Sequence, residues 1–177
     1  MGEQINNYFF KCNTTHPDLR QALLEKTADK NNTWQNIFGI DVCNLSPTFF
    51  EPYDNVYNLF KGLGNNRPFR YSIFRFQPNT CYGWHIDYPG RTCALNLLID
   101  GKDSHTFCGE NVKDQEKKND YINVSRVDYP DDSFILLNVQ KSHTIYNFDN
   151  TRYVLTVSID PPWDFEKTKT YLLDNNF

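Results

Sequence analysis

The stretch Tyr82–Asp87 reads Tyr-Gly-Trp-His-Ile-Asp and contains two potential metal ligands, His85 and Asp87. Side chains alternate between the two faces of a β-strand, so positions 85 and 87 of an extended segment point to the same side. Both could therefore bind one metal ion, but a third ligand has to come from another part of the chain. This requirement favours a sheet that rolls up around a common centre.

His143 is the best candidate for the third ligand, and Arg152 follows it by nine positions. Two neutral imidazoles and one carboxylate leave three positions of an octahedral ion open, as in the facial triad of non-haem Fe(II) oxygenases. Structural zinc sites instead close their coordination with nitrogen and sulfur ligands. An Fe(II) ion with one carboxylate keeps a net positive charge, so the pattern favours a bidentate anionic cosubstrate.

Length and composition limit the class of protein. The chain has 177 residues and a mass of 20.9 kDa, which fits one domain with a substantial core. Aromatic residues make up 16% of the sequence and occur in short runs with β-branched residues, which favours a β-sheet over a helical bundle. The net charge of −4 gives no general attraction to nucleic acids or anionic membranes, so neither is expected as a partner.

The cysteines are odd in number and lack the close paired spacing of a zinc site or a disulfide framework. They are interpreted as free thiols of a reducing compartment, and they are Cys12, Cys43, Cys81, Cys93 and Cys108. The N-terminal residues show no basic segment followed by an apolar one, and no window approaches about 18 apolar residues. A soluble cytoplasmic protein is therefore expected.

From about position 70 onward, short strands alternate with turn residues, a pattern typical of a sandwich or barrel. The charged run Gly109–Asp120 is interpreted as a solvated loop, with a lid over the site as the alternative. Eight strands are expected, which is the number in a jelly roll. They are Tyr71–Phe76, Tyr82–Asp87, Cys93–Ile99, His105–Cys108, Tyr121–Val127, Ser133–Val139, His143–Asn147 and Arg152–Ile159.

The remaining segments are expected to support this core. Helices are predicted over Pro17–Lys30, where proline suits a first helical turn, and over Pro52–Phe60, which is followed by glycines. We therefore expect one mainly β domain for the whole chain. Residues 1–69 would form a region with helices packed on the outside, 70–163 the jelly-roll core, and 164–177 a C-terminal tail.

The segment Phe76–Asp87, with His143 and Arg152 later in the chain, resembles the iron- and 2-oxoglutarate-dependent dioxygenases. The resemblance is to the prolyl-hydroxylase and aspartyl/asparaginyl β-hydroxylase-like branches, and it covers about Tyr71 to Trp163. It implies a double-stranded β-helix, the cupin-like jelly roll, with His-x-Asp on the second strand and the distal histidine on the seventh. The strand count above leads to the same order without the family.

The resemblance also implies the roles of the principal residues. His85, Asp87 and His143 would bind Fe(II), and Arg152 would bind the far carboxylate of 2-oxoglutarate through a two-pronged contact. With O2 as the oxidant, the reaction would hydroxylate a substrate and release succinate and CO2. The expected substrate is an amino acid or another small molecule, or else a protein side chain.

Five further residues are secondary candidates. Asn96 and Tyr71 would help to bind 2-oxoglutarate, whereas Arg91, Tyr82 and Trp84 would contact the substrate. For Arg91 and Asn96, a simple solvent-facing position is the alternative. In a regular strand Tyr82 and Trp84 point away from the metal ligands, because their spacing from the first histidine is odd, and a β-bulge would change that.

Three positions depart from the family pattern and leave the substrate open. Phe76 stands where prolyl hydroxylases usually have tyrosine, Val154 stands where many relatives have serine, and Asp87 is a carboxylate that aspartyl β-hydroxylases typically lack. Two other classes of protein remain as alternatives. A cupin-type metalloenzyme that does not use 2-oxoglutarate would keep the three metal ligands without needing Arg152, and a non-catalytic metal- or sugar-binding jelly roll would need no open coordination position.

Overall fold

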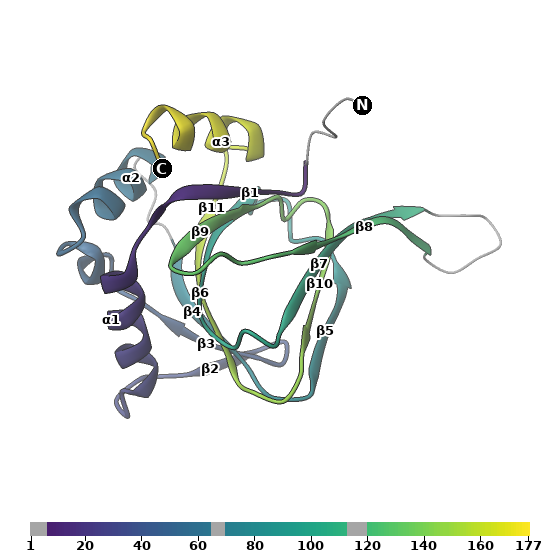
Figure 1. Cartoon of the computed structure of the whole chain (residues 1–177), viewed down its shortest axis with the longest axis horizontal. Coiled ribbons are helices and arrows are strands. Elements are labelled where there is room, and N and C mark those ends of the chain that lie inside the picture. The colour runs from purple at the N-terminus through teal and green to yellow at the C-terminus, as the bar shows by residue number, and fades with distance from the viewer. Residues whose placement is uncertain (1–6, 65–69, 113–119) are drawn as a thin grey trace.

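The chain forms two antiparallel β-sheets, and the computed structural model describes residues 7–64, 70–112 and 120–177 (Figure 1). In chain order the strands are β1 (Phe9–Thr15), β2 (Gln35–Ile37), β3 (Ile40–Asn44), β4 (Arg70–Phe76), β5 (Thr80–His85), β6 (Cys93–Asp100), β7 (His105–Val112), β8 (Asp120–Val127), β9 (Ser133–Leu137), β10 (Ser142–Asn147) and β11 (Arg152–Ile159). Within the described residues, one sheet has the order β1-β9-β6-β11-β4-β3-β2 and the other β5-β10-β7-β8.

The two sheets face each other, so that each has an inner face turned toward the other sheet (Figure 1). Strand β11 shows how the sequence produces this arrangement, because every second side chain points inward. Val154 and Thr156 face the centre, whereas Leu155, Val157 and Ile159 are fully buried on the outer side. Both faces of the larger sheet are therefore covered, and the topology is that of a jelly-roll-like fold.

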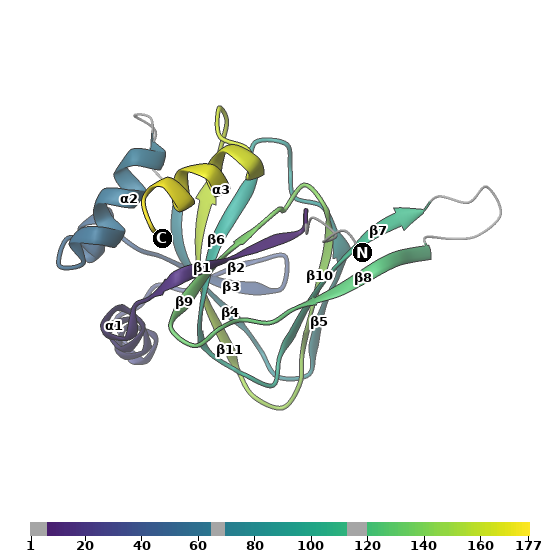
Figure 2. The same cartoon turned by 45° about the horizontal axis from the view of Figure 1, so that its top comes forward.

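Helices lie along the outer face of the larger sheet (Figure 2). They are α1 (Pro17–Ala28), α2 (Asp54–Gly64), α3 (Phe165–Asp174) and the short 3-10 helix η1 (Pro47–Phe50). Leu23 of α1, Phe60 of α2 and Leu172 of α3 are fully buried in one apolar cluster with the outward residues of the sheet. At about 25 cal/mol per Å² of apolar area, this cluster is a main source of stability. No helix among the described residues is long and apolar enough to span a membrane.

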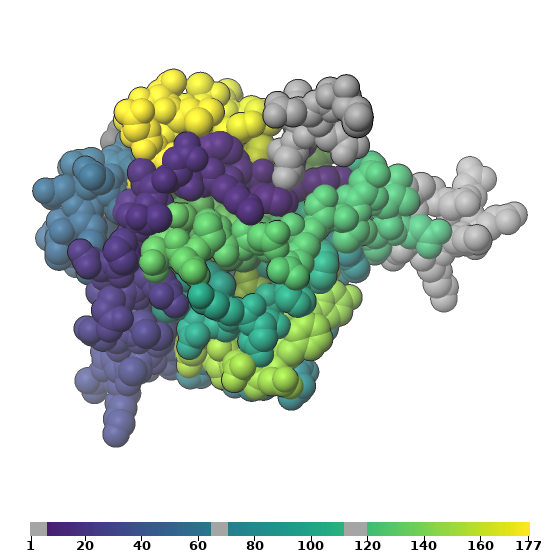
Figure 3. Space-filling view, in the orientation of Figure 1, coloured from purple at the N-terminus to yellow at the C-terminus, as the bar shows by residue number. Residues whose placement is uncertain are grey.

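Each of the eight core strands expected from the sequence has a counterpart, from β4 to β11, with small differences at the ends. The N-terminal region differs from expectation, since it contains β1, β2 and β3 as well as helices. Strand β1 completes one edge of the larger sheet beside β9, and Figure 3 shows its residues running between α3 and the strands below. Strands β1 and β3 were missed because they pair with the distant strands β9 and β4, which no local pattern reveals, whereas β2 is a three-residue strand that pairs with β3 in a short hairpin.

Two other segments also differ from expectation. The C-terminal stretch is not a simple tail, because Asp164 caps the N-terminus of α3 by accepting a hydrogen bond from the Lys167 amide at 2.9 Å. The run Gly109–Asp120 is not a loop throughout, because its first four residues continue β7 and pair with β8. Residues 113–119 lie outside the described residues. The alternative interpretation of this run, a lid over the site, concerns that segment.

Candidate metal centre

Three potential ligands meet at one end of the smaller sheet. His85 on β5 and His143 on β10 are direct cross-strand partners, and their ligand atoms and that of Asp87 all lie within 4.8 Å of one another. Oδ1 of Asp87 is 3.5 Å from Nε2 of His85 and 3.6 Å from Nε2 of His143. An octahedral ion with bonds of about 2.1 Å needs neighbouring ligand atoms about 3 Å apart. A small contraction of the three side chains would therefore accommodate one ion.

Asp87 reaches this site from a position that the sequence did not predict. The expected strand Tyr82–Asp87 ends at His85, because its partner β10 begins at Ser142 and offers no pairing beyond that point. The backbone N–H of Asp87 instead donates to the carbonyl of Val139, at 2.9 Å. The two residues thus share a site through a turn rather than through the alternation of a strand.

Both imidazoles are oriented by the backbone. Nδ1 of His85 lies 2.8 Å from the carbonyl oxygen of Gly83, and Nδ1 of His143 lies 2.9 Å from that of Lys141. A carbonyl can only accept, so each Nδ1 carries the proton and each Nε2 presents its lone pair to the site. Hydrogen bonds of this kind orient the histidines of metal centres and make them better ligands.

The electrostatics of the site suit a cation. Burial, and next the neighbouring charge of His85, lower the pKa of His143 to about 4, so that its ring is neutral at neutral pH. Burial alone would raise the pKa of the Asp87 carboxyl, but the adjacent His85 side chain and the charge of Arg91 outweigh it and hold that pKa below its usual range. The site therefore presents a neutral imidazole from His143 and a carboxylate from Asp87.

A cavity of about 100 Å³ lies between the sheets and is lined by the three ligands and by Arg152. Arg152 is 1% exposed, and its Nη2 donates to Oγ1 of Thr106 at 3.0 Å. The rings of Phe76 and Tyr129 lie 5.7 and 5.1 Å from its guanidinium carbon. Among the described residues, Nε and Nη1 have no hydrogen-bond partner, and no carboxylate pairs with this arginine. A buried cation without a counter-ion is costly, so this end of the cavity suits an anion.

Three of the five secondary candidates also line this cavity, and Tyr82 and Asn96 are two of them. Tyr82 does so, with its ring 4.5 Å from that of His85, because a β-bulge in β5 sets Gly83 and Trp84 opposite the single residue Thr144. The bulge brings back to the inner face a side chain that a regular strand would turn away. Asn96 on β6 does so by regular alternation, and its Oδ1 accepts a hydrogen bond from Oγ1 of Thr156 at 2.9 Å.

Trp84 does not line the cavity. Its ring stacks on that of Tyr121 with centroids 4.1 Å apart, above Gly109, where a Cβ would come within 3.3 Å of the indole. The substrate contact expected for Trp84 therefore has no support from its position. Trp84 directly precedes His85, so strand alternation turns it to the outer face, and the bulge returns only Tyr82 to the inner one.

The position of Tyr71 contradicts its expected contact with 2-oxoglutarate. Its ring packs against Phe50 and Phe60, with centroids 4.8 and 5.5 Å away, in the apolar cluster beneath the helices. On β4 the side chains of Phe74 and Phe76 face the cavity, so a residue at an odd spacing from them points the other way. Tyr71 thus belongs to the core on the helical side.

Arg91 lines the cavity but is already paired, since its Nη1 lies 2.8 Å from Oδ2 of Asp87. The sequence reading missed Thr106 and Tyr129, which flank Arg152. Thr106 could have been found from the alternation of β7, which places it on the inner face. Tyr129 lies in the connection between β8 and β9, and nothing in its local sequence indicates that it approaches the arginine.

No protein-family model and no curated protein matches this sequence. Solved structures do match. A Pseudomonas putida prolyl-4-hydroxylase has a TM-score of 0.61 at 12% identity, covering 87% of this chain and 93% of that one. A viral collagen prolyl hydroxylase from Paramecium Bursaria Chlorella virus-1, in complex with 2-oxoglutarate, has a TM-score of 0.56 at 12% identity, covering 90% and 98%.

HygX from Streptomyces hygroscopicus, with nickel, 2-oxoglutarate and hygromycin B bound, has a TM-score of 0.62 at 9% identity, covering 88% of this chain and 83% of that one. At such low identities these matches establish the fold. The chain has the fold of the iron- and 2-oxoglutarate-dependent oxygenases, as its sequence resemblance implied.

Proposed function

We propose that this protein is an Fe(II)- and 2-oxoglutarate-dependent dioxygenase that hydroxylates an amino acid or a protein side chain. The observation that carries the proposal is the buried guanidinium of Arg152, which lines the same cavity as His85, Asp87 and His143 and has two nitrogen atoms without a hydrogen-bond partner in the described part of the chain. A jelly roll that only held a metal, or a cupin enzyme without 2-oxoglutarate, would have no use for this cation. Its presence therefore favours a cosubstrate with a second carboxylate.

The chain's own residues have separate tasks in this proposal. His85, Asp87 and His143 would hold the iron, which together with 2-oxoglutarate and O2 supplies the oxidising chemistry and leaves succinate and CO2 as products. Arg152 would bind the far carboxylate of 2-oxoglutarate by a charge-assisted contact. Thr106 holds one edge of its guanidinium and so helps to fix the direction of that contact.

Polar and apolar walls would complete the cosubstrate pocket. Asn96 and Thr156 bond each other on the inner face of the larger sheet, which leaves the amide nitrogen of Asn96 directed toward Tyr129, 3.5 Å from its hydroxyl. Val139 and Val154 contribute apolar surface to the same cavity. Such a lining excludes water and strengthens the charge interactions within the pocket.

The substrate class is inferred from the structural neighbours and from the residues beside the candidate metal ligands. Two structural neighbours are named as prolyl hydroxylases and a third contains hygromycin B, so the fold itself accommodates different substrates. Tyr82, packed edge-on against His85, is the best remaining candidate for a substrate contact. The free cysteines fit a reducing compartment, and we propose the cytoplasm as the location.

The test is an anaerobic titration of the Fe(II)-loaded protein with 2-oxoglutarate, followed by the weak visible charge-transfer band of the chelate. We expect Arg152→Ala to weaken 2-oxoglutarate binding by about 30-fold or more, because truncating one partner of a buried charge pair costs at least about 2 kcal/mol. The 2-oxoglutarate affinity of Arg152→Lys should lie between those of the wild type and Arg152→Ala, because an ammonium group contacts a carboxylate at one point and a guanidinium group contacts it through two N–H groups. Arg126→Ala, which removes an exposed arginine bonded to Asp128, is the matched control.

An unchanged titration in Arg152→Ala would contradict the role of the arginine, and retention of iron by His85→Ala would contradict the metal centre. Succinate release, measured across free amino acids and peptides, then identifies the substrate class. The proposal predicts turnover with at least one member of these two classes.

A further inference from the structure

One turn of the chain supports two of the three metal ligands. The turn lies between β9 and β10, and the carbonyl of Val139 accepts the backbone N–H of Asp87 at 2.9 Å. Two residues later, the carbonyl of Lys141 lies 2.9 Å from Nδ1 of His143. The residue between these two carbonyls is Gln140, which the metal centre as described so far does not use.

The side chain of Gln140 reaches across to the segment that carries Asp87. Its Nε2 lies 2.7 Å from the carbonyl oxygen of Arg91 and 3.3 Å from those of Asp87 and Tyr88. The same segment is closed on itself by a bond of 3.0 Å from the N–H of Arg91 to the carbonyl of Tyr88. One amide group therefore ties the turn after β9 to the turn that follows β5.

Arg91 acts on the carboxylate itself. Its Nη1 lies 2.8 Å from Oδ2 of Asp87, and the arginine side chain is 14% exposed. The other oxygen, Oδ1, is the one that lies 3.5 and 3.6 Å from the two imidazole Nε2 atoms. The carboxylate thus has one oxygen held by an arginine and one oxygen directed to the metal position.

We infer that Arg91 and Gln140 are positioning residues that keep Asp87 a one-oxygen ligand of the metal, an inference that rests on the proposed function. An octahedral ion has six positions. The two histidines and one oxygen of Asp87 fill three, 2-oxoglutarate fills two as a chelate, and one remains for O2. If both oxygens of Asp87 bound the metal, that last position would be lost.

Electrostatic attraction of the metal does not explain why Arg91 lies beside Asp87. A cation beside the ligand carboxylate opposes the binding of a second cation, so Arg91 lowers the affinity for the metal through its charge. Its position is favourable only if holding Oδ2 has a benefit of its own. Reserving an open coordination position for the cosubstrates is such a benefit, and outer-shell partners of this kind typically change metal affinity or activity by about 10- to 100-fold.

The experiment uses Co(II) as a spectroscopic probe, because its visible absorption reports coordination number, and compares the whole wild-type chain with Arg91→Met and Gln140→Met. In Arg91→Met we expect the spectrum to change as Oδ2 joins the metal. Co(II) affinity should rise severalfold, whereas 2-oxoglutarate affinity should fall by about 10-fold. Opposite changes in the two affinities are not expected from a residue with a merely structural role. Arg91→Lys, which can still reach Oδ2, should restore the wild-type spectrum.

In Gln140→Met, which removes the amide but no charge, we expect Co(II) affinity to fall by about 10-fold or more. This variant changes an exposed side chain, so it tests the inference even if Arg91→Met does not fold. Arg126→Met and Gln21→Met are the matched controls, since each removes an exposed side chain bonded to a nearby carboxylate, of Asp128 and Glu25 respectively. Both should bind Co(II) as the wild type does.

The inference is overturned if Arg91→Met keeps the wild-type spectrum and 2-oxoglutarate affinity, or if Gln140→Met binds Co(II) as tightly as the wild type. Failure of the proposed function has a different signature. There, wild-type protein binds Co(II) but 2-oxoglutarate leaves its spectrum unchanged, while the spectral change of Arg91→Met still reports the second oxygen of Asp87.

Discussion

Nη2 of Arg152 donates a hydrogen bond to Oγ1 of Thr106 at 3.0 Å, and the two residues belong to opposite sheets. This bond crosses the interior of the jelly roll and holds the guanidinium at a fixed place in the cavity. The nitrogen atoms that remain unpaired are buried, so the protein maintains a charged group whose partner is not among its own described side chains. Such a group reduces stability until an anion binds.

The first prediction concerns the cost of this buried charge. Without metal and 2-oxoglutarate, we expect Arg152→Met to raise the melting temperature by about 2–8 °C, because replacing a buried ion by an apolar side chain of similar length gains about 1–2 kcal/mol. Thermal unfolding followed by circular dichroism measures the change. The exposed Arg126→Met variant should show almost none. A lower melting temperature for Arg152→Met would mean that its contacts with Thr106 and the flanking rings outweigh the cost of burial.

The second prediction concerns pH and His143. Burial lowers the pKa of His143 in the folded protein to about 4 from the ordinary 6.5. Between these pH values its imidazole binds a proton in the unfolded chain but not in the folded protein. His143 therefore does not reduce stability above pH 6.5. As the pH falls toward 4, its protonation in the unfolded chain lowers the free energy of unfolding by up to about 3 kcal/mol. Asp87 does not add to this window, because its pKa is lowered from 3.8.

Urea unfolding of the metal-free protein at pH 7 and pH 4.5 measures this loss. In His143→Gln, the difference in the free energy of unfolding between pH 7 and pH 4.5 should be smaller by most of that amount. His16, whose pKa burial also lowers, is present in both proteins, so its share cancels. An equal difference in wild type and variant would show that the imidazole of His143 is not held neutral.

The third prediction concerns the turn between β6 and β7. Gly101 has a φ of +97°, and a Cβ there would lie 2.7 Å from Cα of Arg152. Gly39 has a φ of +85° with nothing within 4 Å of its Cβ position. In both alanine variants the left-handed backbone lowers the free energy of unfolding by about 1–2 kcal/mol, but Gly101→Ala must also displace the start of β11 at Arg152.

We therefore expect Gly101→Ala to be less stable than Gly39→Ala by at least about 1 kcal/mol, measured by urea unfolding. Gly101→Ala should also bind 2-oxoglutarate more weakly, whereas Gly39→Ala should bind it as the wild type does. Equal 2-oxoglutarate affinities in the two variants would argue against close packing of this turn on Arg152.

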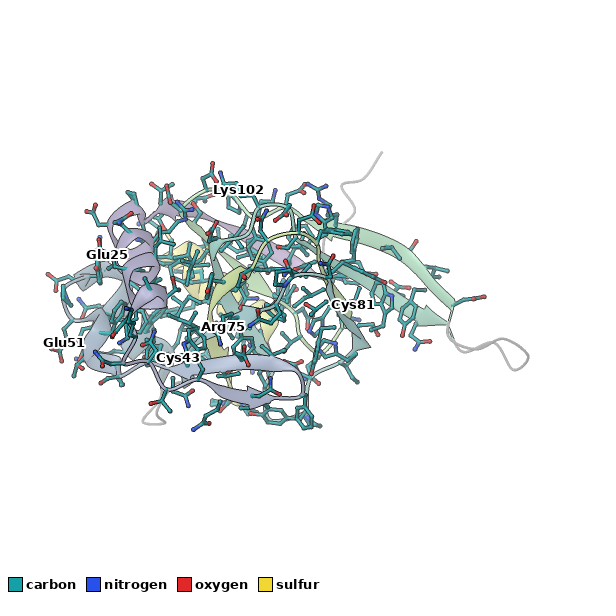
Figure 4. All side chains as sticks on the ribbon, turned by 90° about the horizontal axis from the view of Figure 1, so that it is seen from below. Glu25, Cys43, Glu51, Arg75, Cys81 and Lys102 are labelled. Carbon is teal, nitrogen blue, oxygen red and sulfur yellow. The ribbon has the colours of Figure 1, made fainter. Side chains whose placement is uncertain are left out.

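The fourth prediction concerns thiol reactivity. Burial raises the pKa of Cys12 and Cys108 to about 12 and that of Cys93 to about 11, and Cys43 is also buried with a raised pKa. Cys81 on β5 is exposed and lies well apart from Cys43 on β3 (Figure 4). Because the thiolate is the reactive form, a disulfide reagent should label one thiol quickly in the native protein and the others only on unfolding. The fast phase should disappear in Cys81→Ser, and its persistence there would contradict the assignment.

Much of the site followed from the sequence for a simple reason. The chemistry of a metal centre needs particular residue types, and His85, Asp87, His143 and Arg152 stand out as such types in a series of short strands. The eight core strands were also recognisable, because alternating apolar residues and turn residues are local signals. The structure brings the four residues to one cavity.

Other assignments depended on register, which is not local. A single bulge in β5 brought Tyr82 to the cavity and left Trp84 outside, and an odd spacing on β4 turned Tyr71 toward the helices. A shift of one residue reverses every side chain of a strand, and such shifts are set by pairing with distant strands. The sequence pattern alone therefore named the right strands without deciding the face of each residue.

The sequence by itself indicated a candidate metal centre and the strands that carry most of its residues, because ligand chemistry and side-chain alternation are properties of residues and their neighbours. Only the tertiary structure decided how the centre is held. It pairs Arg91 with Asp87, places Gln140 across two turns and buries Arg152 beside Thr106. The contacts of Gln140 and of Thr106 join segments that are distant in sequence and meet only when the two sheets close on one another, whereas Arg91 and Asp87 are four positions apart and meet through the conformation of the connection after β5.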